Sequence, residues 1–189
     1  GSVRVFGRPP GRVCHRIGYV PQYVHLENHL PISVREVVML GRHRPRRRPF
    51  GSRRRDREAA CRALEKLDVG DLQDRQIDDL SGGQRQRVFI ARAIVDDPEI
   101  LLLDEPAANM DGRGQSGFYQ MLREINRTAT ILMVSHDLMV LSSTVKSVAC
   151  VNRSVHYHDD AEITEEMIDM YECPVELVAH GMPHRVLKR

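Results

Sequence analysis

The stretch formed by residues 79–111 constrains the fold of this chain more than any other part. A short Ser-Gly-Gly-Gln segment comes first, an apolar pattern with helical spacing follows, and a run of aliphatic residues then ends in two carboxylates. A helix followed by a buried strand is typical of an α/β protein with a parallel sheet. The polar groups of this stretch are concentrated at its two ends.

The first end predicts a capped helix with an accessible tip. Ser81 can cap the helix, and Gln84 completes a capping box three residues later. Gly82 and Gly83 have no Cβ atom, so a ligand can approach the backbone closely there. Because a helix N-terminus presents unpaired amides and a positive partial charge, an anion such as phosphate is favoured at this tip.

The second end predicts a buried parallel strand that finishes in acids. Residues 100–103 are large and aliphatic without polar alternation, and Asp104 and Glu105 follow at once. Ligands of open α/β sheets lie at the carboxyl ends of strands. One carboxylate could hold Mg²⁺, directly or through water, and the other could polarise a water for attack on a phosphoryl group. Either end alone indicates only a capped helix or an acidic strand end, whereas both in this order favour phosphate chemistry.

Both ends resemble motifs of one protein family. Residues 80–84, Leu-Ser-Gly-Gly-Gln, resemble the ABC signature, and residues 101–106, Leu-Leu-Leu-Asp-Glu-Pro, resemble the Walker B strand with its catalytic glutamate. Nearly the whole chain resembles the ATP-binding subunit of an ABC transporter. The resemblance implies a partial P-loop NTPase fold, which is an α/β, RecA-like parallel sheet with an inserted helical subdomain, and it implies ATP and Mg²⁺ as cofactors.

The resemblance assigns catalytic roles to side chains at three strand ends. Glu105 would activate the attacking water, and Asp104 would hold Mg²⁺. Gln22 would contact the metal and the attacking water, while its loop would sense the membrane partner. His136 would reach the γ-phosphate. The strand–helix–strand order predicted for residues 100–134 gives a parallel pair with a right-handed crossover, which would bring His136 beside the two acids.

The resemblance also implies an assembly. A homodimer would form, in which Ser81 and the adjoining signature residues Gly82, Gly83 and Gln84 cover the γ-phosphate held by a second copy of the subunit. Asp111 would join the two sites across the dimer. The helical subdomain would dock on a membrane permease, so the protein would be cytoplasmic and peripheral on the inner face of the cell membrane.

Two further stretches resemble the zinc and manganese branch of ABC importers, and they are the grounds for expecting a divalent metal as the transported substrate. They are residues 30–38 and 173–187. A periplasmic or surface metal-binding protein would then be an indirect partner. The chain also contains soft-ligand residues, but no pair has a spacing that defines a zinc site, so we expect no tight zinc binding by the isolated chain. These residues are His156, His158, Cys173, His180 and His184.

The family pattern divides the chain into parts. Residues 1–29 and 96–155 would form the catalytic α/β core, residues 30–95 the helical subdomain, and residues 156–189 a C-terminal tail. Residues 1–6 suggest a short edge strand. Residues 42–57 hold nine arginines, two prolines and a glycine, which favours a solvated connection.

One expected motif is missing from the sequence. The family requires a Gly-x-x-x-x-Gly-Lys-Ser/Thr loop to hold the phosphates, but Lys66, Lys146 and Lys188 each follow a residue other than glycine. We therefore interpret the chain as a domain that lacks its N-terminal part, and we expect it to be inactive alone. Because the strand that leads into the missing loop is central, its absence should leave apolar surface beside the Asp104 strand.

Two other functions are compatible with parts of the sequence. DNA-repair and chromosome-organising ATPases also carry a signature and Walker B, but long coiled coils separate their halves, whereas no sustained heptads separate Gln22 from Ser81 here. A catalytically silent, arginine-rich module could instead bind a partner or nucleic acid. The formal net charge of +2 gives that second alternative little support. Four scattered cysteines indicate reduced thiols rather than a disulfide scaffold.

Overall fold

The computed structural model describes residues 1–22, 31–42, 52–108, 110, 112–135, 145–152 and 154–158. The chain forms two compact units, residues 1–136 and 137–189. The described part of the first unit contains a parallel sheet and the helices α1 to α4, whereas the described part of the second contains a hairpin. The finer division into core, helical subdomain and tail stays a prediction.

The sheet of the first unit consists of parallel strands in the order β1-β2-β3. These strands are β1 (Ile17–Val20), β2 (Ile100–Asp104) and β3 (Thr130–Val134). Val20 lies opposite Leu103, and Asp104 lies opposite Val134. This register confirms the predicted parallel α/β sheet, and it brings the carboxyl ends of all three strands to one edge.

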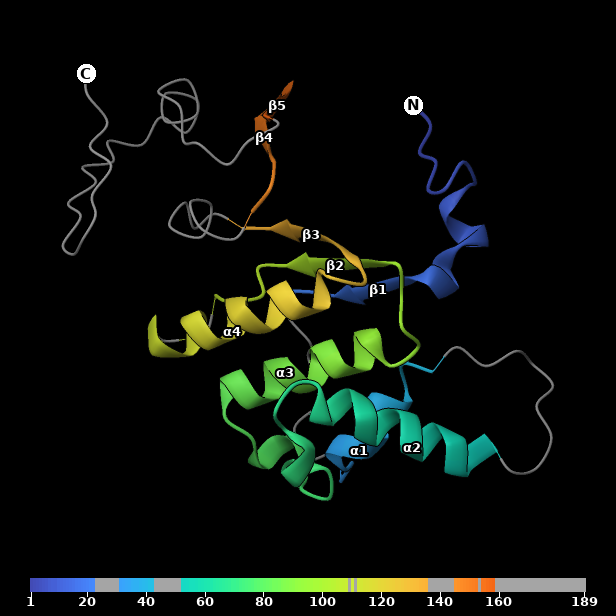
Figure 1. The fold of residues 1–189 in the computed structure, drawn as a ribbon, viewed down its shortest axis with the longest axis vertical. Coiled ribbons are helices and arrows are strands. Elements are labelled where there is room, and N and C mark those ends of the chain that lie inside the picture. Colours follow the sequence, from blue (N-terminus) through green and yellow to red (C-terminus); the bar gives the residue numbers. More distant parts are fainter. Residues whose placement is uncertain are drawn as a thin grey trace. The chain divides into compact units, whose positions relative to one another are not determined.

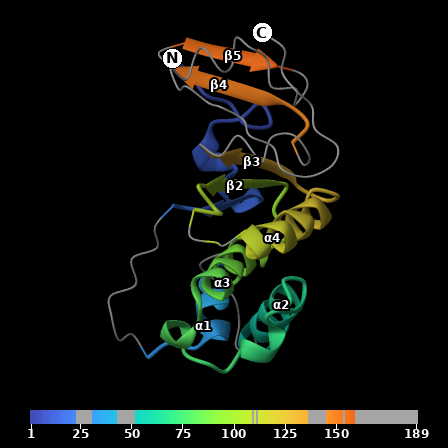
Figure 2. The same ribbon diagram turned by 90° about the vertical axis from the view of Figure 1, so that its left-hand side faces the viewer.

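The helices form two layers on one side of this sheet (Figures 1 and 2). The nearer layer consists of α3 (Gly82–Ile94) and α4 (Gly112–Ile125), and the farther layer consists of α1 (Val34–Met39) and α2 (Ser52–Glu65). The predicted apolar faces are the buried ones, because Val88 and Ala91 of α3 and Phe118 and Leu122 of α4 are all at most 3% exposed. The core therefore lies between the sheet and α3, and between α3 and α2.

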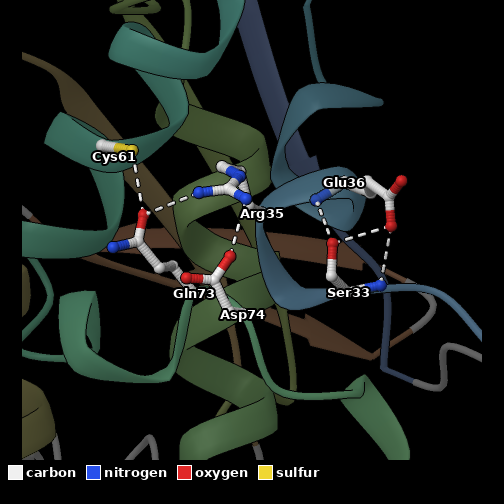
Figure 3. A network of polar contacts seen from close by, with 6 residues as sticks. All are labelled: Ser33, Arg35, Glu36, Cys61, Gln73 and Asp74. Atoms are coloured by element: carbon white, nitrogen blue, oxygen red, sulfur yellow. Dashed lines mark hydrogen bonds and ion pairs between the residues drawn. The ribbon is translucent and has the colours of Figure 1, made fainter.

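A polar network fixes the start of α1 against α2 and the loop that leads to α3 (Figure 3). Arg35 donates hydrogen bonds to the side chains of Gln73 and Asp74, at 3.2 and 2.6 Å, and the Cys61 thiol donates to the same Gln73 oxygen at 3.1 Å. The backbone N–H of Arg35 also donates to the carbonyl of Gln73, at 3.0 Å. These bonds join three segments that lie far apart in the sequence.

A capping box fixes the start of α1. The Ser33 hydroxyl accepts a hydrogen bond from the Glu36 N–H, and the Glu36 carboxylate accepts bonds from the N–H and the hydroxyl of Ser33. These bonds hold the pKa of Glu36 below its ordinary value, the Ser33 hydroxyl contributing most and the Ser33 backbone N–H next. The cap is therefore strongest when Glu36 is ionised.

The prediction of a solvated arginine-rich connection is wrong for Arg42, and its last residues are exposed but helical. Arg42 donates a hydrogen bond to Asp56 at 3.1 Å, forms an ion pair with Asp96, and donates to the carbonyl of Val95 at 3.4 Å. The Asp56 side chain is 1% exposed and the Arg42 side chain 17%. Residues 52–57 belong to α2 rather than to a connection. The arginine-rich composition suggested full exposure, but the buried Asp56 carboxylate pairs with Arg42 and keeps its side chain mostly buried. The stretch 43–51 lies outside the described residues.

The predicted strand at residues 1–6 is also wrong. An isolated bridge between Val5 and Arg8 closes a turn, in which Phe6 and Gly7 both have positive φ angles. The chain then passes through 3₁₀ turns at Pro10–Arg12 and Cys14–Arg16 before β1 begins. Reversal directly after Val5 leaves too few extended residues for a strand, and the prolines cannot donate to a ladder.

The apolar surface expected beside the Asp104 strand lies elsewhere. β2 is paired on both sides, by β1 and by β3, so neither of its edges is open. The exposed apolar side chains of the sheet belong to the outer strands instead: Tyr19 of β1 is 53% exposed, and Leu132 and Val134 of β3 are 61% and 59% exposed. The predicted position of the apolar surface was wrong because the sequence does not specify which strand lies next to which.

The described part of the second unit contains an antiparallel hairpin, β4 (Val148–Asn152) and β5 (Ser154–His158). Residues 136–144 and 159–189 lie outside the described residues. No helix in the described part of the chain is long and apolar enough to cross a membrane.

The buried ion pair of Arg42 yields a stability prediction. Replacing Asp56 with alanine should lower the free energy of unfolding by about 3–5 kcal/mol, because it leaves the Arg42 charge without one of its buried partners. Urea denaturation measures this change. The control is Glu58→Ala, which removes an exposed pair with Arg54 on the same helix and should change stability by less than about 1 kcal/mol. Equal effects of both substitutions would contradict the buried cluster.

The capping box yields a pH prediction. Because folding lowers the pKa of Glu36, its contribution is present at neutral pH and is lost as the pH falls below the ordinary value of 4.5. The difference in unfolding free energy between the native chain and Glu36→Gln should therefore shrink on acidification. Chemical denaturation at a series of pH values tests this. A difference that is independent of pH would show that the carboxylate charge does not matter.

Candidate functional site

Three of the predicted catalytic residues lie at the carboxyl edge of the sheet. Asp104 ends β2 and is partly buried, Glu105 follows it and is partly buried, and Gln22 follows β1 with its side chain exposed. The register places Val20 of β1 beside Leu103, so the segment after β1 emerges next to the two acids. An edge that presents carboxylate and amide oxygens fits a hydrated divalent cation.

The backbone of Glu105 is in the left-handed region, with φ at +45°. Its N–H donates to the carbonyl of Val134 at the end of β3, at 2.9 Å, and its own carbonyl accepts from Ala108 at 3.3 Å. A non-glycine residue in this region is strained, and such strain often accompanies function. The strain interrupts the strand alternation immediately after Asp104, so the two neighbouring acids are held on differently oriented backbone.

Two predicted site residues cannot be placed. His136 and Asp111 lie outside the described residues. Val134 and Ser135, which precede His136, are described, and Val134 pairs with Asp104. The chain therefore leaves β3 at the same edge as the acids, which is the location expected for His136, although its role stays a prediction.

The signature residues form the exposed tip of α3. The Ser81 hydroxyl accepts a hydrogen bond from the Gln84 N–H at 3.3 Å, and the Gln84 side chain accepts from the Ser81 N–H at 3.1 Å, which confirms the predicted capping box. Ser81 and Gly82 are exposed. A Cβ atom on Gly83 would meet nothing within 4 Å. The backbone at this tip is accessible, as a site for an anion requires.

Two arginines that the sequence analysis left without a role hold the tip in place. Arg85 donates to the carbonyls of Asp78 and Leu80, at 3.3 and 3.5 Å, in the turn that precedes the signature. Arg87 donates to the carbonyl of Leu67 at 2.9 Å, just beyond the end of α2. Arg87 also lies 3.5 Å from the Asp68 carboxylate. The sequence gave no indication of the other contacts, because all three acceptors are backbone carbonyls.

The far end of α3 is packed tightly against other elements. A Cβ atom on Gly18 of β1 would lie 2.5 Å from the carbonyl oxygen of Ala93, and one on Gly41 would lie 1.9 Å from that of Arg92. These glycines let the last turn of α3 approach β1 and the end of α1. In Figure 1 the strands point toward the same side of the view as the N-terminal tip of α3, but the tip and the sheet edge belong to different layers.

An ion pair joins the opposite, amino-terminal ends of β1 and β2. Arg16 and Glu99 form it, and the Glu99 N–H donates to the carbonyl of Arg16 at 2.9 Å. The bonds from the Arg16 guanidinium lower the pKa of Glu99, and the same carboxylate raises the pKa of Arg16. This pair supports the register from the side of the sheet away from the acids.

The expectation that the histidines and cysteines form no tight zinc site stays a prediction, because only part of the set lies within the described residues. Within that part of the chain, no group of three or more His, Cys, Asp or Glu side chains is arranged to hold an ion. His156 lies on β5, where its ring contacts the Ser154 hydroxyl at 3.0 Å, and His158 ends the same strand. Cys173, His180 and His184 lie outside the described residues.

Comparisons with known proteins agree with this geometry. The family model described as ABC transporter matches residues 1–108. The zinc import ATP-binding protein ZnuC of Cereibacter sphaeroides is 43% identical over 151 residues, which is 79% of this chain and 58% of that protein. The ZnuC protein of Paracoccus denitrificans is 46% identical over 139 residues, or 72% of this chain and 50% of that protein.

A solved structure is also similar. A metal-chelate type ABC transporter in an inward-facing conformation matches 84% of this chain and 65% of its own chain, with a TM-score of 0.75 and 26% sequence identity. The chain spans roughly half to three fifths of the length of the two ZnuC relatives. These comparisons support the predicted P-loop NTPase type of α/β fold, while the roles of single residues stay predictions.

Gly41 and Gly83 differ in the space around their Cα atoms, and this difference yields a stability prediction. Gly41→Ala should destabilise the protein by about 1–3 kcal/mol or more, because the added methyl group meets the backbone of Arg92. Gly83→Ala should change stability by less than about 1 kcal/mol, since the space is open and alanine favours a helix. Thermal or urea denaturation of the matched pair tests this. A tolerated Gly41→Ala would contradict the close approach of α3 and α1.

Proposed function

The chain belongs to the ABC transporter family, and on that basis we propose that it is part of an ATP-hydrolysing subunit that drives transport across a membrane. The observation that carries the proposal is the carboxyl edge of the sheet. There Asp104 ends the central strand and Glu105 follows it. Gln22 follows one neighbouring strand, and the chain toward His136 follows the other. Parallel α/β sheets bind their ligands at this edge.

The donor set at the edge fits Mg²⁺. Mg²⁺ usually keeps several waters and binds through one or two carboxylates together with substrate phosphates. Asp104, partly buried at the strand end, would hold the ion, and the Gln22 side-chain oxygen would contact it. When bound, the ion neutralises charge on the β- and γ-phosphates of ATP.

Three side chains of the chain have defined tasks in this proposal. Glu105 accepts a proton from the attacking water, and its strained backbone holds the carboxylate in position through the bond to Val134. Gln22 orients the same water. His136 donates to the γ-phosphate from the end of β3. Positioning of this kind accounts for much of the catalysis in phosphoryl transfer.

The signature acts on the nucleotide of a second copy. Ser81, Gly82, Gly83 and Gln84 form an exposed tip in a separate layer from the sheet edge, which is compatible with a site completed across a homodimer. Asp111 joins the two halves. Because the sequence contains no phosphate-binding lysine after a glycine, the 189-residue chain needs a P-loop from further polypeptide to hydrolyse ATP.

The transported substrate is a divalent metal, either zinc or manganese, in this proposal. The names of the ZnuC relatives support zinc, and the stretches at residues 30–38 and 173–187 support the same branch. The subunit would act with a permease, receive metal indirectly from a periplasmic or surface binding protein, and lie on the cytoplasmic face of the membrane.

An N-terminal extension tests the proposal. The segment that precedes the matched region in the Paracoccus denitrificans ZnuC protein is fused to this chain, and ATP hydrolysis is measured by phosphate release. The extended protein should hydrolyse ATP, whereas the 189-residue chain should show negligible turnover. Glu105→Gln in the extended protein should lower turnover on the order of 100-fold or more, because the proton acceptor is lost.

The matched control is Glu58→Gln, which changes an exposed carboxylate of α2 and should leave turnover unchanged. Hydrolysis by the 189-residue chain that disappears with Glu105→Gln would show that it needs no P-loop. Full turnover of the extended Glu105→Gln protein would show that Glu105 has another role.

A further inference from the structure

The outward side of α2 carries an unusual arrangement of charge. This helix lies in the layer farther from the sheet (Figures 1 and 2), where it contacts α1 and α3. Its inward side chains are buried, and they are Asp56, Ala59, Ala60, Ala63 and Leu64. Every exposed position between residues 54 and 65 is charged, and these positions are Arg54, Arg55, Arg57, Glu58, Arg62 and Glu65. The helix is therefore fixed to the core on one side and presents only charge on the other.

The cations at the start of this helix are poorly neutralised. Arg54, whose side chain is 90% exposed, pairs with Glu58 one turn later, and exposed pairs of this kind contribute little. Within the described part of the chain, no hydrogen bond or ion pair engages the guanidinium of Arg55 or Arg57. Arg57 and Glu36 of α1 interact through charge at longer range. The arginines thus present a positive surface to any anion outside the protein.

The stability of the helix does not account for this cluster. Arg53, Arg54 and Arg55 follow the first residue of α2, and its first turn contains no acid. Cations near a helix N-terminus are unfavourable, because the helix dipole places positive partial charge there. Like charges in one turn also repel one another. An external layer of negative charge offsets both effects.

Different anionic partners place different demands on such a surface. Single-stranded nucleic acid needs aromatic side chains on which its bases stack, and α2 contains none. A protein partner needs an apolar centre in the interface, whereas the exposed positions between residues 54 and 65 are all charged. Anionic lipid headgroups need only clustered Lys or Arg, because their negative surface potential attracts each cation separately. The chemistry of this surface therefore favours a lipid layer.

We propose that the arginine face of α2, formed by Arg54, Arg55, Arg57 and Arg62, contacts the anionic phospholipid headgroups of the membrane that the transporter serves. The contact is electrostatic, because the apolar side of α2 is packed against the core and cannot insert between acyl chains. The inference rests on the proposed function for a location beside a membrane, but it involves none of the residues assigned to ATP chemistry.

Vesicle sedimentation with the 189-residue chain tests the contact. Vesicles of equal parts phosphatidylglycerol and phosphatidylcholine are compared with vesicles of phosphatidylcholine alone. The chain should bind only the phosphatidylglycerol vesicles, and it should be released as salt rises from about 0.1 M to about 1 M, because the Debye length shortens from about 10 Å to about 3 Å. The assay needs neither nucleotide nor turnover, so a failure of the ATPase proposal and a failure of this one appear in different measurements.

Substitutions at exposed positions locate the binding surface without disturbing the fold. Arg55→Gln should weaken binding to the phosphatidylglycerol vesicles about fivefold, and Arg55→Gln combined with Arg57→Gln about 30-fold, because each removes one cation from the attraction of the surface. Glu65→Gln removes an anion from the same helix and should strengthen binding. Arg12→Gln is the matched control: it removes an exposed arginine from the turns that precede β1, and it should change binding by less than about twofold.

Several results would overturn the proposal. Equal binding to pure phosphatidylcholine vesicles, or binding that salt does not weaken, would indicate apolar adsorption. Equal losses with Arg55→Gln and Arg12→Gln would show that total charge, rather than the arginine face, decides binding. No binding to the phosphatidylglycerol vesicles at low salt would refute the contact with lipid. Binding of duplex DNA that Arg55→Gln weakens would then assign the arginine face to nucleic acid.

Discussion

The parallel pairing of β2 between β1 and β3 is the constraint on which the rest of the described structure depends. It is reinforced at one end by the pair between Arg16 and Glu99 and at the other by the bond from Glu105 to Val134. Because strand pairing fixes register in single-residue steps, these two ends leave no freedom for a slip. The acids can therefore be placed with precision at an edge where three chain segments emerge together.

The helical layers depend on a different kind of interaction. The tip of α3 is exposed, but its position is set by distant contacts: Arg87 reaches the chain just beyond α2, and the last turn of α3 rests against Gly18 and Gly41. Arg42 also pairs with Asp56 of α2 and with Asp96, which follows α3, so this cluster joins the two helices. A helix held along its length in this way can present a glycine-rich end without losing its own order.

Much of this fold is local in origin, and those parts were predictable. Capping boxes at Ser33 and Ser81, the aliphatic run before Asp104 and the apolar face around Phe118 each depend on a few neighbouring residues. What failed depends on distant partners. The inward turn of Arg42 requires Asp56 to be buried, and the exposed apolar surface follows strand order, which the strands themselves do not encode. The edge that gathers Gln22 and the acids was predictable because parallel strands must share it, whereas the left-handed backbone of Glu105 left no signal in the sequence.

The positive φ angle of Glu105 has a consequence for how this position can vary. Residues with a branched Cβ, such as valine and isoleucine, pay most to enter the left-handed region, while glycine, asparagine and aspartate enter it readily. Two requirements therefore decide which amino acids can replace Glu105, the backbone conformation and the proposed chemistry, and they rank the amino acids differently. The proposed role as proton acceptor favours glutamate at this position, whereas the backbone conformation favours glycine, asparagine or aspartate.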